Sequence, residues 1–317
     1  MYSIIIPVYK NEQSLPRLIK VICDLQSKLD KQLEAVFVVD GSPDRSFEKL
    51  KELIESLEFP VQLVGHARNF GSFAAIRTGL IEARGKYFAV MAADLQEPPD
   101  LMLAFFNSLS TGQCDVVIGT RSRRQDPLLS RWMSLVFWRI YRRMVMPDLP
   151  VGGVDVFGCN LQFRDHLITL QESRSSLVAL IFWLGFRRKC IPYERLERKE
   201  GKSSWTLKNK MDYLFDSIFS FTDYPIKLLV RIGALGSIFA IGLSGLVLAA
   251  KLTGAISVPG YAATLLVVLI FGSFNLLGLG LVGVYAWRAY ENSKQRPLAV
   301  VAVKLQNKTA KTNEPNS

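Results

Sequence analysis

Asp94 and Gln96 are the residues whose types and spacing point most directly to chemistry. They follow the apolar run 87–93 and come shortly before two prolines. If the strand continues through residue 96, its alternating side chains turn the Asp94 carboxylate and the Gln96 amide to one side and Leu95 to the other. Carboxylate and amide oxygens are the ligands that Mg²⁺ and Mn²⁺ prefer. The pattern therefore predicts a site for Mg²⁺ or Mn²⁺ where the strand ends, with a plain turn as the alternative.

Similar polar groups follow three other apolar runs. They are Asp40-Gly41-Ser42 after AVFVV, Arg68-Asn69-Phe70-Gly71 after VQLVGH, and Arg121-Ser122-Arg123 after VVIGT. Residues 1 to about 120 alternate strand and helix patterns, which predicts an α/β domain with a mostly parallel sheet covered on both faces. Ligands of such sheets bind beyond the carboxyl ends of the strands. The four groups therefore predict one pocket at that edge, although any one of them alone could be a turn.

The formal net charge of +11 is unevenly distributed. Residues 1–100 hold 12 Lys and Arg against 14 Asp and Glu, whereas residues 101–231 hold 20 against 12. The basic excess thus lies toward the long apolar segments described next. A high pI can indicate nucleic-acid binding, but this distribution favours an anionic membrane surface or an anionic lipid substrate. We therefore expect no nucleic acid among the partners.

Two charge-free stretches, 232–250 and 262–287, are long enough to cross a bilayer, and two buried core helices are the alternative. Positive charge flanks the pair on its outer sides, so the positive-inside rule places both termini in the cytoplasm. Small residues in both stretches favour close helix packing and a homo-oligomer. The expected elements are a transmembrane helix at 228–250, an extracytoplasmic turn at 251–261, a second transmembrane helix at 262–287 and a disordered cytoplasmic tail at 288–317.

Two further segments have amphipathic patterns, one at about 128–146 and one at 206–227. In the first, the arginines fall on one helical face and large apolar side chains occupy much of the rest. In the second, polar residues recur at every fourth position from Lys208 to Ser220. We expect both to be helices at the membrane surface. Ordinary helices that pack on the core are the alternative.

Several motifs, taken in order, resemble those of glycosyltransferase family 2 and, within it, the polyprenyl-phosphate branch. They are IIIPVYKNE, VVDGSPD, RNFGSFAAIRTGLIEARG, MAADLQEPPD, GTRSRR and RLERKEGKSSW, and the resemblance covers about residues 1–290. It implies a cytoplasmic catalytic domain of the GT-A nucleotide-sugar-binding fold at 1–205. It also implies inverting transfer of one sugar from a nucleotide sugar to a polyprenyl phosphate at the cytoplasmic membrane. UDP-glucose and undecaprenyl phosphate are the expected pair, and GDP-mannose or another UDP-sugar is the alternative donor.

The resemblance also implies roles for individual residues. Those expected to hold the nucleotide are Pro7, Tyr9, Glu12 and Asp40, to which we add Arg68 from the strand-end groups. Those expected at the phosphates and the acceptor are Arg121, Arg123, Ser203 and Trp205. The implied metal ligands are Asp94 and Gln96, and the implied catalytic residues are Asp94, Asp155 and Arg198. Arg198 belongs near the donor pyrophosphate and Asp155 near the reacting carbon, where an orienting role is favoured over general-base catalysis.

Two positions depart from the family pattern. Val39 and Ala92 stand where the family often has acidic residues, so a non-enzymatic scaffold with impaired catalysis is an alternative. We expect activity to survive because Asp94 and Gln96 are present. A processive polysaccharide synthase is a further alternative, but its QxxRW motif is absent and two spans are few for polymer export.

Overall fold

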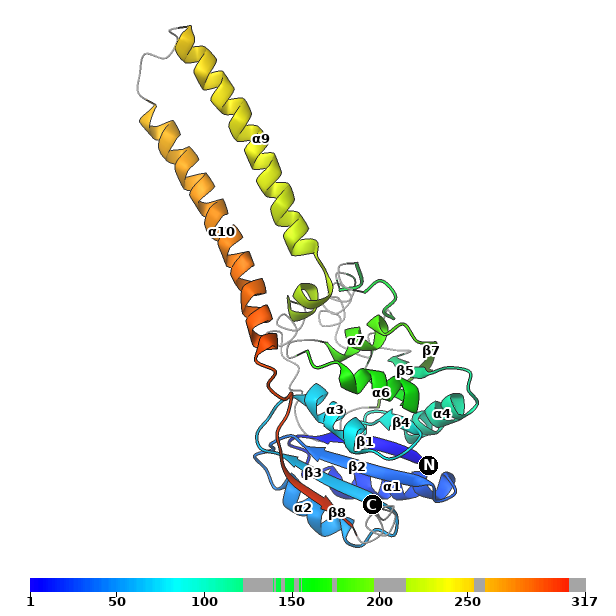
Figure 1. Ribbon diagram of the computed structural model, residues 1–317. Coiled ribbons are helices and arrows are strands. Elements are labelled where there is room, and N and C mark those ends of the chain that lie inside the picture. Colours follow the sequence, from blue (N-terminus) through cyan, green and yellow to red (C-terminus); the bar gives the residue numbers. More distant parts are fainter. Residues whose placement is uncertain are drawn as a thin grey trace. The chain divides into compact units, whose positions relative to one another are not determined.

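The computed structural model describes residues 1–121, 139, 141–143, 146–150, 154, 156–172, 176–196, 215–253 and 260–307. The chain forms two compact units (Figure 1). The sheet unit comprises Met1–Tyr213 and Pro297–Ser317, and the helical unit comprises Leu214–Arg296.

The sheet unit contains one eight-stranded sheet with the strand order β7-β5-β6-β4-β1-β2-β3-β8. Its strands are β1 (Tyr2–Val8), β2 (Leu33–Val39), β3 (Val61–His66), β4 (Tyr87–Val90), β5 (Val116–Arg121), β6 (Phe157–Asn160), β7 (Arg188–Tyr193) and β8 (Val301–Gln306). The pairs β1–β2, β1–β4, β2–β3 and β5–β7 are parallel, whereas β3–β8, β4–β6 and β5–β6 are antiparallel. The mostly parallel sheet predicted from the sequence is confirmed.

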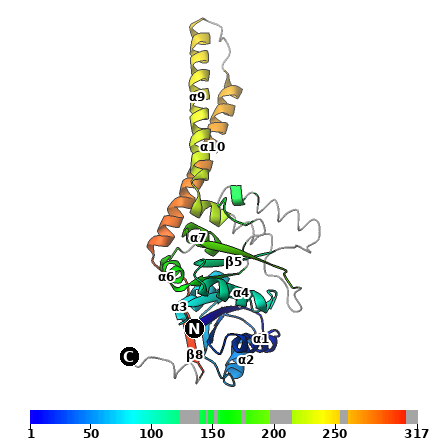
Figure 2. The same ribbon diagram turned by 90° about the vertical axis from the view of Figure 1, so that its right-hand side faces the viewer.

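Helices cover both faces of this sheet, which explains why β2 and β3 are buried along their whole length. The described helices are α1 (Leu15–Lys28), α2 (Ser46–Ile54), α3 (Ser72–Glu82), α4 (Pro99–Ser110), α6 (Leu161–Thr169) and α7 (Leu177–Trp183). On one face, Ile4 shares a buried cluster with Leu15 and Leu18 of α1. On the other, α3 packs so closely on β1 that a Cβ added to Gly79 would lie 2.3 Å from Ile5 Cγ2. Figure 2 shows α1 and α2 on the opposite side of the sheet from α3.

Residues 301–306 belong to the sheet, so the expectation of a disordered tail is wrong for this part of the chain. They form β8, which pairs antiparallel with β3 at the edge of the sheet. Asn307 then closes the strand: its Oδ1 accepts a hydrogen bond from Val61 N at 3.1 Å, and its Nδ2 donates to Leu57 O at 3.0 Å and Phe59 O at 2.8 Å. The cause is long-range pairing, because the backbone of β8 pairs with β3, and Lys304 of β8 forms an ion pair with Glu82 of α3. Residues 308–317 lie outside the described residues.

The helical unit contains α9 (Tyr224–Leu252) and α10 (Tyr261–Ser293), which contact each other (Figure 2). Their stretches Tyr224–Leu243 and Ile270–Ser293 are long and apolar enough to cross a membrane. Large apolar side chains on both helices are exposed, as Ile238 (68 %) and Leu276 (73 %) show. Exposed apolar surface of this extent is typical of a site that contacts a membrane or another protein.

A short helical segment, 215–221, precedes α9, from which Thr222 and Asp223 separate it. The described part of the amphipathic stretch predicted at 206–227 is this segment together with residues 222–227, of which 224–227 belong to α9. Most of the stretch predicted at 128–146 lies outside the described residues. Arg288 of α10 holds the segment, since its Nη2 donates to Asp216 Oδ1 at 2.7 Å and its Nη1 donates to Ser220 Oγ at 3.0 Å. The segment is therefore tied to α10.

Candidate active site

Most of the polar groups singled out in the sequence lie at one edge of the sheet. The strands β1 to β4 run parallel to one another, and β6 is antiparallel to both β4 and β5. It follows that β4 and β5 run in the same direction and that β1 to β5 all end at the same edge. The predicted residues that follow or end these strands there are Tyr9, Glu12, Asp40, Arg68, Asp94, Gln96 and Arg121. Pro7 lies within β1 opposite Val38.

Asp40 ends β2 and organises the neighbouring loop after β3. Its side chain is 4 % exposed and lies 2.8 Å from Nδ1 of His66. Its oxygens also accept hydrogen bonds from the backbone N–H groups of Phe70 at 2.8 Å and Gly71 at 2.7 Å. His66 in turn places Nε2 2.9 Å from the hydroxyl of Thr78 on α3. Asp40 therefore holds the loop after β3 through buried contacts, and its direct contact with the nucleotide stays a prediction.

Gly41 allows the exits of β2 and β3 to meet. Its φ is +55°, and a Cβ at this position would lie 2.2 Å from the backbone carbon of Arg68. No side chain fits that approach. Beside it, the Arg68 guanidinium lies 4.1 Å from the centroid of the Phe70 ring and donates to Asn69 O. Arg68 is thus an exposed cation on a loop held by buried contacts.

The loop after β1 is fastened to the loop after β2. The Lys10 N–H donates to Ser42 Oγ at 2.8 Å, and Arg45 N–H donates to Glu12 Oε2 at 3.2 Å. Asp44 connects the two loops, since it accepts from Glu12 N–H as well as from Ser42 Oγ. Burial disfavours the charged form of Asp44, but hydrogen bonds from Ser42, Ser46 and Glu12 outweigh it and hold the pKa of Asp44 below its usual value. The two loops therefore form one preorganised wall.

Tyr9 presents its side chain at this wall. It is 38 % exposed and directly follows β1, and the Lys10 ammonium lies 5.3 Å from its ring centroid. An exposed aromatic ring is suited to stacking on a planar base, and the carboxylate of Glu12 on the same loop is suited to accepting hydrogen bonds. This geometry is compatible with the nucleotide-binding role that the resemblance implies.

Asp94 and Gln96 lie in a turn, so the extended conformation predicted for them is wrong. The strand β4 ends at Val90, and Leu95 has φ +56°. The Gln96 N–H lies 3.4 Å from Asp94 Oδ1, as in a turn closed by an aspartate side chain. Leu95 is buried in the core cluster, as expected. A positive φ is rare for leucine, which is why the sequence offered this turn only as the alternative.

The two side chains of this turn are not equivalent. Asp94 is half-buried, whereas Gln96 is 8 % exposed and uses both ends of its amide inside the protein. Gln96 Oε1 accepts from Arg195 Nη2, and Gln96 Nε2 donates to Leu196 O at 3.3 Å. Arg195 and Leu196 follow β7, which is parallel to β5 and so ends at the same edge. Arg195 and His66 were not predicted as site residues, because an isolated Arg or His carries no spacing signal.

The turn fits a divalent metal through Asp94 but not through Gln96. Mg²⁺ is usually held by one or two carboxylates together with substrate phosphates. Asp94 supplies such a carboxylate, whereas the amide oxygen of Gln96 already accepts from a guanidinium, whose positive charge would repel a nearby cation. Among the described residues there is no cluster of three or more His, Cys, Asp or Glu that could hold a metal. A metal at Asp94 would therefore need ligands from the substrate.

The remaining predicted residues are placed only in part. Arg121 is the last residue of β5, is half-buried, and stands opposite Tyr193 of β7. The residues that lie outside the described part of the chain are Arg123, Asp155, Arg198, Ser203 and Trp205.

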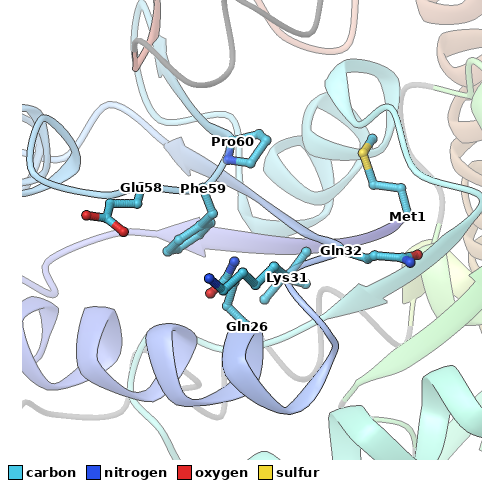
Figure 3. A pocket seen from close by; sticks show the side chains of 8 residues that line it. Met1, Gln26, Lys31, Gln32, Glu58, Phe59 and Pro60 are labelled. Atoms are coloured by element: carbon cyan, nitrogen blue, oxygen red, sulfur yellow. The ribbon is translucent and has the colours of Figure 1, made fainter.

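A hollow of about 360 Å³ lies at the other edge of the sheet (Figure 3). Its lining comes from residues that precede or begin strands and from the end of α1, namely Met1, Gln26, Lys31, Gln32, Leu33, Glu58, Phe59 and Pro60. Ligands of parallel α/β sheets bind at the carboxyl ends of the strands, which is the opposite edge. This hollow is therefore separate from the candidate active site.

Comparison with known proteins identifies the family. Residues 3–170 match glycosyl transferase family 2. An uncharacterized glycosyltransferase of Bacillus subtilis is 32 % identical over 302 residues, which is 95 % of this chain and 93 % of that protein. An undecaprenyl-phosphate 4-deoxy-4-formamido-L-arabinose transferase of Pseudomonas aeruginosa is 32 % identical over 306 residues, covering 94 % of this chain and 88 % of that protein.

Solved structures with a similar arrangement are more distant. Glucosyl-3-phosphoglycerate synthase from Mycobacterium tuberculosis, in complex with Mn²⁺, UDP-glucose and phosphoglyceric acid, has a TM-score of 0.47 at 15 % identity, over 74 % of this chain and 80 % of that one. A mannosyltransferase from Pyrobaculum calidifontis, in complex with GDP-Man and Mn²⁺, has a TM-score of 0.44 at 16 % identity, over 88 % and 86 %. The sequence matches carry the assignment: the chain belongs to glycosyltransferase family 2 and is a glycosyltransferase with a GT-A nucleotide-sugar fold.

Proposed function

We propose that this enzyme transfers one sugar, with inversion, from a nucleotide sugar to the phosphate of a polyprenyl phosphate at the cytoplasmic face of a membrane. The observation that carries the proposal is the match to the Pseudomonas aeruginosa transferase. Its name specifies undecaprenyl phosphate, and the match includes the region of the two long apolar helices. An acceptor with a long hydrocarbon tail requires an enzyme that works at a bilayer.

The connectivity of the chain supports a membrane hairpin. The chain leaves the sheet unit at Tyr213 and rejoins it at Pro297, and β8 pairs with β3 of that unit. If one of the helices α9 and α10 spans a bilayer, the other must span it back, since the sheet unit stays on one side. This agrees with the distribution of Lys and Arg, which favours the cytoplasm for both termini.

The chemistry requires a site that stabilises a leaving diphosphate. The bond from the anomeric carbon to the donor diphosphate breaks, a bond to an oxygen of the acceptor phosphate forms, and a nucleoside diphosphate departs. A phosphate monoester has a second pKa near 6, so the acceptor is largely dianionic at neutral pH and needs little help from a general base. Negative charge builds on the leaving group, and cations preorganised around it lower the barrier.

The described residues at the strand ends fit these tasks. In our proposal, Tyr9 and Glu12 hold the nucleoside, and Asp40 maintains the loop that carries Arg68. Asp94 holds Mg²⁺ or Mn²⁺, which when bound supplies Lewis-acid stabilisation of the diphosphate. The phosphates and the acceptor are contacted by Arg121 and by the residues that the family resemblance implies, namely Arg123, Arg198, Ser203 and Trp205. Asp155 orients groups near the reacting carbon.

A transfer assay with the full-length protein in detergent tests the proposal. Purified enzyme is incubated with undecaprenyl phosphate, Mn²⁺ or Mg²⁺, and radiolabelled UDP-glucose, GDP-mannose or UDP-N-acetylglucosamine in separate reactions. We expect one donor, with UDP-glucose as the first candidate, to label the lipid. Asp94→Asn should lower the rate by about 100-fold or more, since it removes the charge that supports the leaving group. Asp24→Asn, on the exposed side of α1, is the matched control. Absence of labelled lipid with every donor would refute the proposed acceptor.

A further inference from the structure

The turn after β4 and the exit of β7 are fastened together by three hydrogen bonds that converge on one residue. Gln96 accepts from Arg195 through Oε1 and donates to Leu196 O through Nε2. The Leu196 N–H also donates to Gln96 O at 2.8 Å. These residues are about 100 positions apart in sequence, and β6 and β5 lie between β4 and β7 in the sheet. The contact therefore bridges the strand ends of the candidate site.

This bridge places a permanent positive charge next to the turn that carries Asp94. An arginine stays protonated at any physiological pH and offers five donors. The bond to Gln96 uses Nη2, and Nε is buried and has no hydrogen-bond acceptor in the part of the chain that the structure describes. Arginine donors pair strongly with phosphate oxygens. Among the described residues, the side-chain partner of this guanidinium is a neutral amide, which leaves the positive charge of Arg195 for a ligand.

We propose that Arg195 binds the diphosphate of the nucleotide sugar and that Gln96 is the positioning residue that holds it in place, rather than a metal ligand. The inference rests on the proposed function, because it needs a nucleoside diphosphate at the carboxyl edge of the sheet. The two side chains of the turn then have different roles. Asp94 holds the metal on one side of the diphosphate, and Gln96 holds the Arg195 guanidinium on the other side. Loss of either Gln96 or Arg195 should then have the same consequence.

Nucleotide binding by the full-length protein tests this division. The affinities for UDP and GDP, with Mn²⁺ present, are measured by calorimetry. For the nucleotide that binds, the affinity of the diphosphate is then compared with that of the corresponding monophosphate. We expect Gln96→Ala and Arg195→Ala each to weaken diphosphate binding by about 10- to 100-fold, the value of a charged hydrogen bond. The double variant should be no weaker than the worse single variant, because both remove one interaction. Monophosphate affinity should be nearly unchanged, which a merely structural defect would not allow.

The metal provides the second readout. Titration of Mn²⁺ with the nucleoside diphosphate present, followed by the electron paramagnetic resonance signal of free Mn²⁺, should give wild-type affinity for Gln96→Ala at saturating nucleotide. Gln26→Ala, at the opposite edge of the sheet, serves as the control glutamine. If Gln96→Ala weakens Mn²⁺ binding about tenfold or more and Arg195→Ala does not, Gln96 is a metal ligand and the inference fails.

Two other outcomes separate the inference from the proposed function. Equal loss of monophosphate and diphosphate binding would overturn the inference and leave the transfer reaction intact. If the binding results are as expected but wild-type enzyme labels no polyprenyl phosphate, the role of Arg195 stands and the proposed acceptor is wrong. Failure of the wild-type protein to bind either nucleoside diphosphate would overturn both.

Discussion

Replacement of Asp40 by asparagine distinguishes a buried support from a ligand-binding carboxylate. The native carboxylate accepts hydrogen bonds from the N–H groups of Phe70 and Gly71 and lies 2.8 Å from His66 Nδ1. Asparagine has one acceptor oxygen in place of two. Its amide nitrogen would therefore face a backbone or ring donor, and one buried N–H would lose its acceptor.

The expected cost follows from this count. A buried donor left without an acceptor costs about 1–3 kcal/mol, and the remaining bonds lose the strength that the negative charge gave them. We therefore expect Asp40→Asn to lower the free energy of unfolding by about 2–3 kcal/mol. For a domain of roughly 150–250 residues, each kcal/mol shifts Tm by about 2–4 °C, so Tm should fall by about 4–12 °C.

Thermal unfolding of the full-length protein in detergent measures the effect, with Asp24→Asn as the exposed control. Nucleotide affinity is measured below the Tm of the variant. If Asp40 supports the loop, Tm falls and nucleotide binding weakens with it. If instead Tm matches that of the control while nucleotide affinity is lost, Asp40 contacts the nucleotide directly and the reasoning from its buried bonds is refuted.

Three further predictions concern other parts of the chain. Hydrogen bonds from Arg187 hold the pKa of Asp115 below its usual value, so this pair stabilises the fold above about pH 4, and this stabilisation is lost as pH falls through the lowered pKa. The difference in Tm between wild type and Asp115→Asn should therefore shrink on acidification. A difference that does not depend on pH would contradict the pairing. Asn307→Ala should cost about 2–4 kcal/mol in chemical denaturation because it removes three side-chain hydrogen bonds that close β8, whereas a disordered tail would show no change. Arg288→Met and Asp216→Asn should each lower Tm without adding in the double variant, since they break one ion pair; additive losses would show that the two act separately.

The sequence predicted the sheet and its functional edge because those features depend on local patterns. Apolar runs followed by polar residues mark β2 to β5, and the edge follows from parallel pairing. The same reasoning placed Asp40, Arg68 and Asp94 at strand ends before any geometry was known, whereas Tyr9 came from the family resemblance. These residues could be found because each directly follows an apolar run.

The remaining features depend on contacts between distant segments. The strand β8 is short and polar at its end, and its place in the sheet depends on pairing with the edge strand β3. The turn at Asp94 depends on a positive φ at Leu95, which leucine rarely adopts without a fixed environment. The bond between Gln96 and Arg195 joins two loops that no spacing rule connects. Sequence patterns report burial and periodicity but not these pairings.

The identity of the leaving nucleotide and the lipid linkage test the central claim most directly. Phosphorus NMR of a completed reaction with undecaprenyl phosphate resolves both products at once. Sugar transfer to the lipid phosphate predicts a lipid phosphodiester and one equivalent of nucleoside diphosphate. A lipid diphosphate with release of a nucleoside monophosphate, or an unchanged lipid phosphate, would contradict it.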